Sequence, residues 1–243
     1  MKIRSLLFMA FVLAIFTGNA QQESAVSLSQ DMLTSLKMNQ PVDEYEKSLE
    51  NIPFQALVDE LNTDHKKFAF WINVYITYGQ KLISSTENAE CDNKCKKQKV
   101  INIAGRMFSL NDILYRILLH SKCTVTGGKK PHSPKWEKML RVGYPDGRVL
   151  LAIDSDSDIA AEITYYEPEN LDNQLNIVSL LFIKKFVYYN ADTDEVYIPK
   201  WIKNFKREFG KTPGIYAGLR KAEIIKEGDE PKIIYSDKIA TLK

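Results

Sequence analysis

The alternation of apolar and polar residues along the chain predicts a fold built mainly from helices. The segment His65–Ile83 is apolar on nearly all sides, which is typical of a helix buried at the centre of a domain. Apolar residues also recur at helical spacing over Leu110–His120, after a good capping residue at Ser109. Further helices are predicted over residues 42–49, 53–61, 136–140, 159–166, 170–185 and 199–209.

Shorter apolar runs predict a small sheet. Residues 100–108 form a strand that turns at Gly105, and Arg148–Ile153 has the composition most typical of a strand. Two hairpins are predicted, one joining 186–189 to 195–198 and one joining 223–225 to 232–235. The predicted fold class is therefore α+β, a helix-rich single domain with a small, mainly antiparallel sheet.

The N-terminus has the layout of a secretory signal. Lys2 and Arg4 precede an apolar run, Leu6–Phe16, which ends in the small residues Gly18–Ala20. We therefore expect a signal peptide over residues 1–20 and a lead-in over 21–40 that is either mobile or a short first helix. Residues 41–243 would form the globular domain. The apolar run is too short to span a bilayer comfortably, so we expect a soluble, exported protein, periplasmic or extracellular.

The charge balance of the chain bears on its partners. The chain has 33 Lys and Arg against 31 Asp and Glu, and loss of Lys2 and Arg4 with the signal would leave the two equal. Such a balance gives no support for nucleic-acid binding. Two lysine-rich loops, 94–99 and 129–130, are most simply solvated surface, although an anionic envelope polymer is a possible partner for them.

The three cysteines are Cys91, Cys95 and Cys123, which allow one disulfide and one remaining thiol. The close spacing of Cys91 and Cys95 in a polar stretch favours a disulfide that closes a local loop over a metal site. Zinc would need further ligands, and the chain has only three scattered histidines. We expect no metal and no cofactor.

Several motifs occur in a characteristic order: Phe70–Tyr75, Phe108–Ile113, Asp146–Arg148, Leu171–Leu175 and Val196–Pro199. In this order they resemble domain of unknown function 547, and the resemblance extends over about residues 55–242. The usual pattern of that family places Cys and His residues where a thiol nucleophile and its base could act. The resemblance therefore implies a candidate thiol site in typical members.

This chain departs from the family pattern at the positions that would carry that chemistry. Ile76 stands where the pattern has Asn, and Leu114 and Tyr115 stand where it has Glu and His. Leu150, Asp154 and Ser155 replace His, Asn and Cys. The resemblance therefore implies that the thiol site has been lost.

Ser155 is the remaining candidate nucleophile, and His120 is the candidate base, with Asn73 or Asp112 orienting it. The simpler interpretation is that Ser155 or Ser157 caps a helix that begins near Ile159.

Asp154, Asp156 and Asp158 resemble the start of a calcium loop. Ile159 and Tyr165 stand where an EF-hand needs Gly and Glu, so an EF-hand is excluded. A looser carboxylate site for a divalent ion stays open as a third hypothesis.

Five polar residues are candidates for ligand binding: Asn73, Tyr75, Asp112, Arg148 and Asp154. Structural roles compete with this interpretation, because Asn73 in an apolar helix needs hydrogen-bond partners and Arg148 can pair with Asp146 or Asp112. Trp71 and Tyr75 share a helix face and favour a place in the core.

The sequence favours a non-catalytic, pseudoenzyme-like binding module of the cell envelope or exterior, whose ligand could be an envelope polymer or a peptide. The alternative is a hydrolase or transferase that uses Ser155 as its nucleophile.

Overall fold

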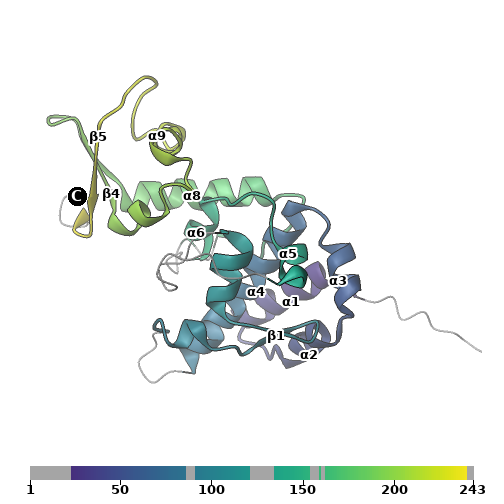
Figure 1. Cartoon of the computed structure of the whole chain (residues 1–243). Helices are drawn as coiled ribbons and strands as arrows, with labels where there is room; N and C mark the ends of the chain where they lie inside the picture. The colour runs from purple at the N-terminus through teal and green to yellow at the C-terminus, as the bar shows by residue number, and fades with distance from the viewer. Residues whose placement is uncertain (1–22, 86–90, 121–133, 154–158, 160–161, 240–243) are drawn as a thin grey trace, which may run out of the picture.

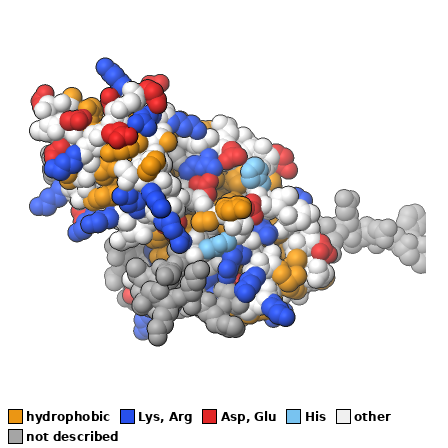
Figure 2. Space-filling model, turned by 45° about the horizontal axis from the view of Figure 1, so that its top comes forward, with side chains coloured by type: hydrophobic (Ala, Val, Ile, Leu, Met, Phe, Trp, Pro, Cys, Tyr) orange, Lys and Arg blue, Asp and Glu red, His pale blue; other side chains and the backbone are white. Residues whose placement is uncertain are grey.

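The structure is a computed structural model and describes residues 23–85, 91–120, 134–153, 159 and 162–239 (Figure 1). A body of helices contains α1 to α6, and the long helix α8 leads from it to a small lobe with β4, β5 and α9 (Figure 1). This arrangement confirms the predicted α+β class. Basic and acidic side chains are both spread over the face shown in Figure 2, as the nearly balanced composition would produce.

Helix α4 (Asp64–Ser84) forms the centre of the helical body, as its pattern predicts. Phe70, Trp71 and Ile72 are fully buried, and the Thr63 hydroxyl caps the helix by accepting from the backbone N–H of Lys66. Helices α2 (Asp43–Asn51) and α3 (Phe54–Glu60) confirm two of the predicted helices to within two residues.

Residues 25–37 are not a mobile lead-in but a helix, α1 (Ala25–Lys37), which packs along α4. Its start is bound to the end of α3, because the Glu60 carboxylate accepts from the backbone N–H groups of Ala25 and Val26 at 2.8 and 2.9 Å. A carboxylate at this position also suits the positive end of the helix dipole. Of the two predictions for this segment, a mobile lead-in or a short first helix, the structure confirms the helix.

The strand predicted over 100–108 is a tight hairpin of β1 (Ile101–Ile103) and β2 (Arg106–Phe108). Its turn residues, Ala104 and Gly105, have φ angles of 52° and 68°, the left-handed pair that a two-residue hairpin requires. The chain then enters η2 (Asp112–Leu118), a π-helix, with the Ser109 hydroxyl accepting from the Asp112 N–H at 3.1 Å. The predicted cap and helix are confirmed, and the short helix α5 (Lys135–Leu140) follows.

The strand predicted for Arg148–Ile153 is wrong, because this segment is a short helix, α6 (Arg148–Ile153). The Asp146 carboxylate accepts from the Arg148 N–H at 2.9 Å and so satisfies the first turn. Val149, Leu150 and Leu151 are all buried, as the segment packs against α4 and α8. A short apolar run that is buried on every side has no helical or strand periodicity, so its pattern could not separate the two.

Helix α8 (Leu171–Phe186) confirms the prediction for 170–185, but the described residues 162–166 before it form no helix. The predicted hairpin of β3 (Tyr188–Asn190) and β4 (Glu195–Pro199) is also confirmed. The 199–209 helix is present only as the short 3-10 helix η4 (Lys200–Phe205). Helix α9 (Lys211–Lys221), which the sequence analysis did not predict, follows it.

The second predicted hairpin is wrong. Residues 223–225 belong to the turn that ends α9, where Glu223 has a φ of 59° and the Ile224 N–H donates to the Leu219 carbonyl. Strand β5 (Lys232–Ser236) instead pairs in parallel with β4, on the edge that β3 leaves open. Partner choice here depends on which strand edge lies nearby, and this information is not local in sequence.

No helix in the part of the chain that the structure describes is long and apolar enough to pass through a membrane.

Candidate functional site

A cavity of about 550 Å³ lies among α4, η2, α6 and η4, beside the 3-10 helix η1 (Cys95–Lys97). This volume is in the range of small-molecule binding sites. The lining combines many apolar and aromatic side chains with few polar ones. Its members are Lys37, Tyr75, Ile76, Gly79, Gln80, Ile83, Cys91, Lys96, Leu110, Leu114, Tyr115, Leu150, Ala152, Ile153, Ile163, Tyr166, Trp201 and Phe205.

Helix α4 contributes one side of the cavity through residues that share a face. Gly79 lines it together with Tyr75 and Ile76, which precede it by four and three residues, the spacings that share a helix face. A Cβ placed on Gly79 would meet no atom within 4 Å. The missing side chain at Gly79 therefore leaves part of this space open.

Aromatic rings form another part of the wall. Tyr115 on η2 stacks on Phe205 of η4, with ring centroids 6.4 Å apart and planes 14° from parallel. Trp201 meets Phe205 edge to face at 6.2 Å. Such pairs hold the rings in fixed orientations and present a large apolar surface to a ligand.

The charged groups of the described lining are both cationic. Lys37, at the end of α1, donates from its ammonium to the Ile163 carbonyl oxygen, and burial lowers the pKa of Lys37 below its ordinary value. Lys96 lies on η1. No aspartate or glutamate belongs to the described lining.

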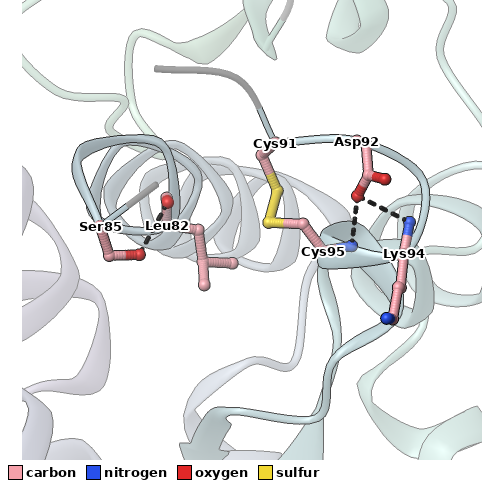
Figure 3. The surroundings of a disulfide bond; sticks show 6 residues. All are labelled: Leu82, Ser85, Cys91, Asp92, Lys94 and Cys95. Atoms are coloured by element: carbon pink, nitrogen blue, oxygen red, sulfur yellow. Dashed lines mark hydrogen bonds between the residues drawn. A yellow bond between two sulfur atoms is a disulfide. The ribbon is translucent and has the colours of Figure 1, made fainter. Parts of the chain in front are cut away.

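The segment with Lys96 is held by a disulfide between Cys91 and Cys95, which confirms the predicted closure of a local loop (Figure 3). The Asp92 carboxylate accepts from the backbone N–H groups of Lys94 and Cys95 at 3.0 and 2.8 Å. Figure 3 shows this loop beside the end of α4, near Leu82 and Ser85. Cys91 lines the cavity, so the disulfide is part of its wall.

Comparison with known proteins assigns a family to this fold. Residues 58–183 match the family described as "Protein of unknown function, DUF547", which is more than half of the chain. The chain belongs to the DUF547 family. A search of curated proteins and a search of solved structures each found no match. The DUF547 match includes α4, η2 and α6 but ends before Trp201 and Phe205, so residues beyond it complete the cavity.

The positions at which this chain departs from the DUF547 pattern converge in the structure. Ile76, Leu114, Tyr115 and Leu150 come from three different elements, and all four line the cavity. The resemblance implies amide, carboxylate and imidazole groups at these positions in typical members, whereas this chain presents apolar and aromatic side chains. Asp154 and Ser155, the other substituted positions, lie outside the described residues.

Of the residues predicted to bind a ligand, Tyr75 lines the cavity and Asn73 has a structural role. Asn73 is fully buried, and its amide donates to the Tyr166 carbonyl at 2.9 Å and accepts from the Tyr166 N–H at 2.8 Å. It also donates to the Ser29 hydroxyl at 3.3 Å. Asn73 thus joins α1, α4 and the segment before α8 rather than facing a ligand.

Asp112 and Arg148 are likewise engaged within the fold. Asp112 accepts from the Ser109 N–H at 3.0 Å and from Arg116 at 3.2 Å. Arg148 pairs with Asp146 through two guanidinium nitrogens, as one of the alternatives predicts, and reaches Asp172 at 2.7 Å. Neither residue lines the cavity.

His120, the candidate base, is not among the residues that line the cavity. It follows η2 with a φ of 48°, and its Nε2 is buried and has no hydrogen-bond partner among the residues that the structure describes. Burial, followed by the charge of Arg141, lowers the pKa of His120 to about 4. The Ser155–His120 pair itself is untested, because Ser155 lies outside the described residues, as do Asp156 and Asp158.

Sequence reasoning missed Gly79, Lys37, Trp201 and Phe205 as parts of the site. An isolated glycine in a strongly apolar helix is the one signal that was present, since it costs helix stability and often has a packing or functional reason. The others are far apart in the chain and carry no local motif.

Proposed function

We propose that this protein is a non-catalytic member of the DUF547 family that binds an apolar small molecule, exported to the cell envelope or exterior. The observation that carries the proposal is the convergence of Ile76, Leu114, Tyr115 and Leu150 on one cavity. By the family resemblance, the four substitutions remove an amide, a carboxylate and two imidazole groups, and with them the groups suited to acid–base chemistry at these positions. The space remains, and its surface now favours apolar contact.

The energetics suit binding better than turnover. Burial of apolar ligand surface contributes about 25 cal/mol per Å², which is enough for useful affinity in a cavity that is already formed. A neutral group such as the Tyr115 phenol is a poor base, and Leu114 and Leu150 have no polar atoms. An apolar occupant therefore fits this lining better than a peptide or a polar envelope polymer, which would need hydrogen-bond partners for each buried amide or hydroxyl.

Gly79 offers a direct test. In the chain beginning at Gln21, we expect the neutral apolar fluorophore N-phenyl-1-naphthylamine to bind with one site per chain. Gly79→Leu places a side chain in the open space of the cavity and should lower this affinity by about tenfold or more. Fluorescence titration measures both affinities.

Gly79→Ala is the matched control, because it changes helix propensity with little filling. We expect Gly79→Ala to retain the fluorophore and to raise the free energy of unfolding by about 0.5–1 kcal/mol. Unchanged fluorophore affinity in a folded Gly79→Leu variant would contradict the proposal. Ester or amide turnover that Ser155→Ala abolishes would also contradict it and support the hydrolase.

A further inference from the structure

We propose that the ligand of this cavity is a single-chain amphiphile with an anionic head, and that Lys96 binds the head. This inference rests on the proposed function and adds the chemical class of the ligand. It comes from the sign of the charges in the described lining of the cavity and from the environment of Lys96.

The charged side chains in the described lining of the cavity have one sign. The described lining combines two lysines with an apolar and aromatic surface and has no acidic side chain. An ammonium beside such a surface is partly desolvated, which costs free energy unless an anion compensates it. Interactions between charges are also stronger in this environment than in open water. The cavity therefore favours an anionic ligand over a cationic one.

Lys96 is the lysine placed to meet that anion. It is partly buried, and no hydrogen-bond or ion-pair partner for its ammonium occurs in the part of the chain that the structure describes. The next residue, Lys97, is exposed and does not line the cavity. Two adjacent lysines with the same charge thus differ in their access to the ligand.

The backbone at Lys96 is held in place before a ligand binds. The Lys96 N–H donates to the Asp92 carbonyl at 3.0 Å, and the preceding residue, Cys95, is bonded to Cys91. Restricting the segment in this way reduces the conformational entropy lost on binding. The disulfide and the Asp92 carboxylate, both drawn in Figure 3, thus hold the segment that carries Lys96.

The remaining surface of the cavity suits a single alkyl or acyl chain. Ile76, Ile83, Leu110, Leu114, Leu150 and Ile153 supply aliphatic contacts, and Trp201 and Phe205 add ring surface. Each methylene that becomes buried should raise the affinity by about three- to fourfold until the cavity is full.

The experiment compares four ligands that share a twelve-carbon chain, all below their micelle-forming concentrations. They are dodecanoate, dodecyl phosphate, dodecanol and dodecyltrimethylammonium, each measured by displacement of N-phenyl-1-naphthylamine. We expect at least one anion to bind about tenfold more tightly than dodecanol, with the cation weakest. The two anions separate a carboxylate ligand from a phosphate ligand.

Variants at Lys96 and Lys97 test which residue binds the head group. Lys96→Gln should lower the affinity for the preferred anion by about tenfold and leave that for dodecanol within about twofold. Lys97→Gln should change neither affinity, and Lys96→Arg should restore the preference for the anion. Circular dichroism confirms that each variant is folded.

Three results would each overturn this inference while leaving the apolar cavity in place. Dodecanol could bind as tightly as both anions, the two glutamine variants could have equal effects, or the cation could bind most tightly. If the fluorophore fails to bind, or binds equally well to Gly79→Leu, the proposed function fails first and this inference fails with it.

Discussion

At the scale of single residues, Asn73 shows how one buried amide determines the shape of the cavity. Its two strong hydrogen bonds satisfy both backbone groups of Tyr166, whose side chain lines the cavity. Asn73→Ala would leave the buried Tyr166 N–H unpaired and the Tyr166 carbonyl with only the longer bond from the Gln30 amide, at 3.4 Å, and should lower the free energy of unfolding by about 2–4 kcal/mol. Urea denaturation measures the loss, and the same variant should bind the fluorophore more weakly.

Thr77→Ala is a suitable control for Asn73. Thr77 is also fully buried in α4, but its hydroxyl donates only to the Asn73 carbonyl of its own helix, at 2.9 Å. We expect its loss to cost about 1 kcal/mol and to leave binding unchanged. Equal effects of the two alanine variants would show that the amide has no special role.

His120 predicts a pH dependence of stability. Its pKa in the folded protein is about 4, below the ordinary value of 6.5, so the unfolded chain binds a proton first as the pH falls. The stability associated with neutral His120 is complete above about pH 6.5 and is lost as the pH falls through 4. Allowing for its partial exposure, we expect a contribution of about 1–2 kcal/mol.

The measurement is urea denaturation of the wild type and His120→Asn at several pH values between 7 and 4. Asparagine tolerates the left-handed backbone of this position. Asp64 and Arg141, the charged residues that shift the pKa of His120, are present in both proteins. The wild type should lose more stability over this interval. If the stabilities of the two proteins fell in parallel with pH, the pH dependence could not be assigned to His120.

At the scale of elements, a buried carboxylate joins η2 to α5. Glu137 is almost fully buried and pairs with Arg116 of η2 and, at 3.1 Å, with Arg141 just beyond α5. Glu137→Ala would leave two guanidinium groups without this carboxylate and should lower the free energy of unfolding by about 3–5 kcal/mol. Thermal and urea denaturation give the value.

The exposed pair of Lys200 and Asp237, 3.5 Å apart, provides the comparison. Because both side chains are mostly in water, Lys200→Ala should cost less than about 1 kcal/mol. If Glu137→Ala were equally mild, the charge network would not be what holds η2 against α5.

At the scale of the whole molecule, the last strand supports a wall of the cavity. β4 is the central strand of its sheet, and η4, with Trp201 and Phe205, follows it directly. Truncation after Asp229 removes β5 and leaves a two-stranded hairpin, which is marginally stable. We expect a loss of at least about 2 kcal/mol in unfolding free energy and weaker fluorophore binding.

Truncation after Ile239 retains β5 and should behave as the full chain does in both measurements. If removal of β5 lowered the free energy of unfolding but left fluorophore binding unchanged, β5 would stabilise the small lobe without supporting the cavity.

The sequence by itself determined those features that depend on near neighbours. The pattern of α4, the capping residue Ser109, the hairpin turn at Gly105 and the Cys91–Cys95 spacing each specify local geometry, because the interacting groups lie within a few residues of one another. The order of the motifs along the chain likewise predicted the family, and the family match over residues 58–183 confirms it.

Only the tertiary structure decided that Arg148–Ile153 is a helix and that β5 joins β4 in parallel. A fully buried run lacks periodicity, and a strand pairs with whichever edge the fold brings near. The cavity depends on the same kind of information, since its lining comes from segments between Lys37 and Phe205. Close packing of distant segments creates it, and no local pattern encodes which side chains will face one another.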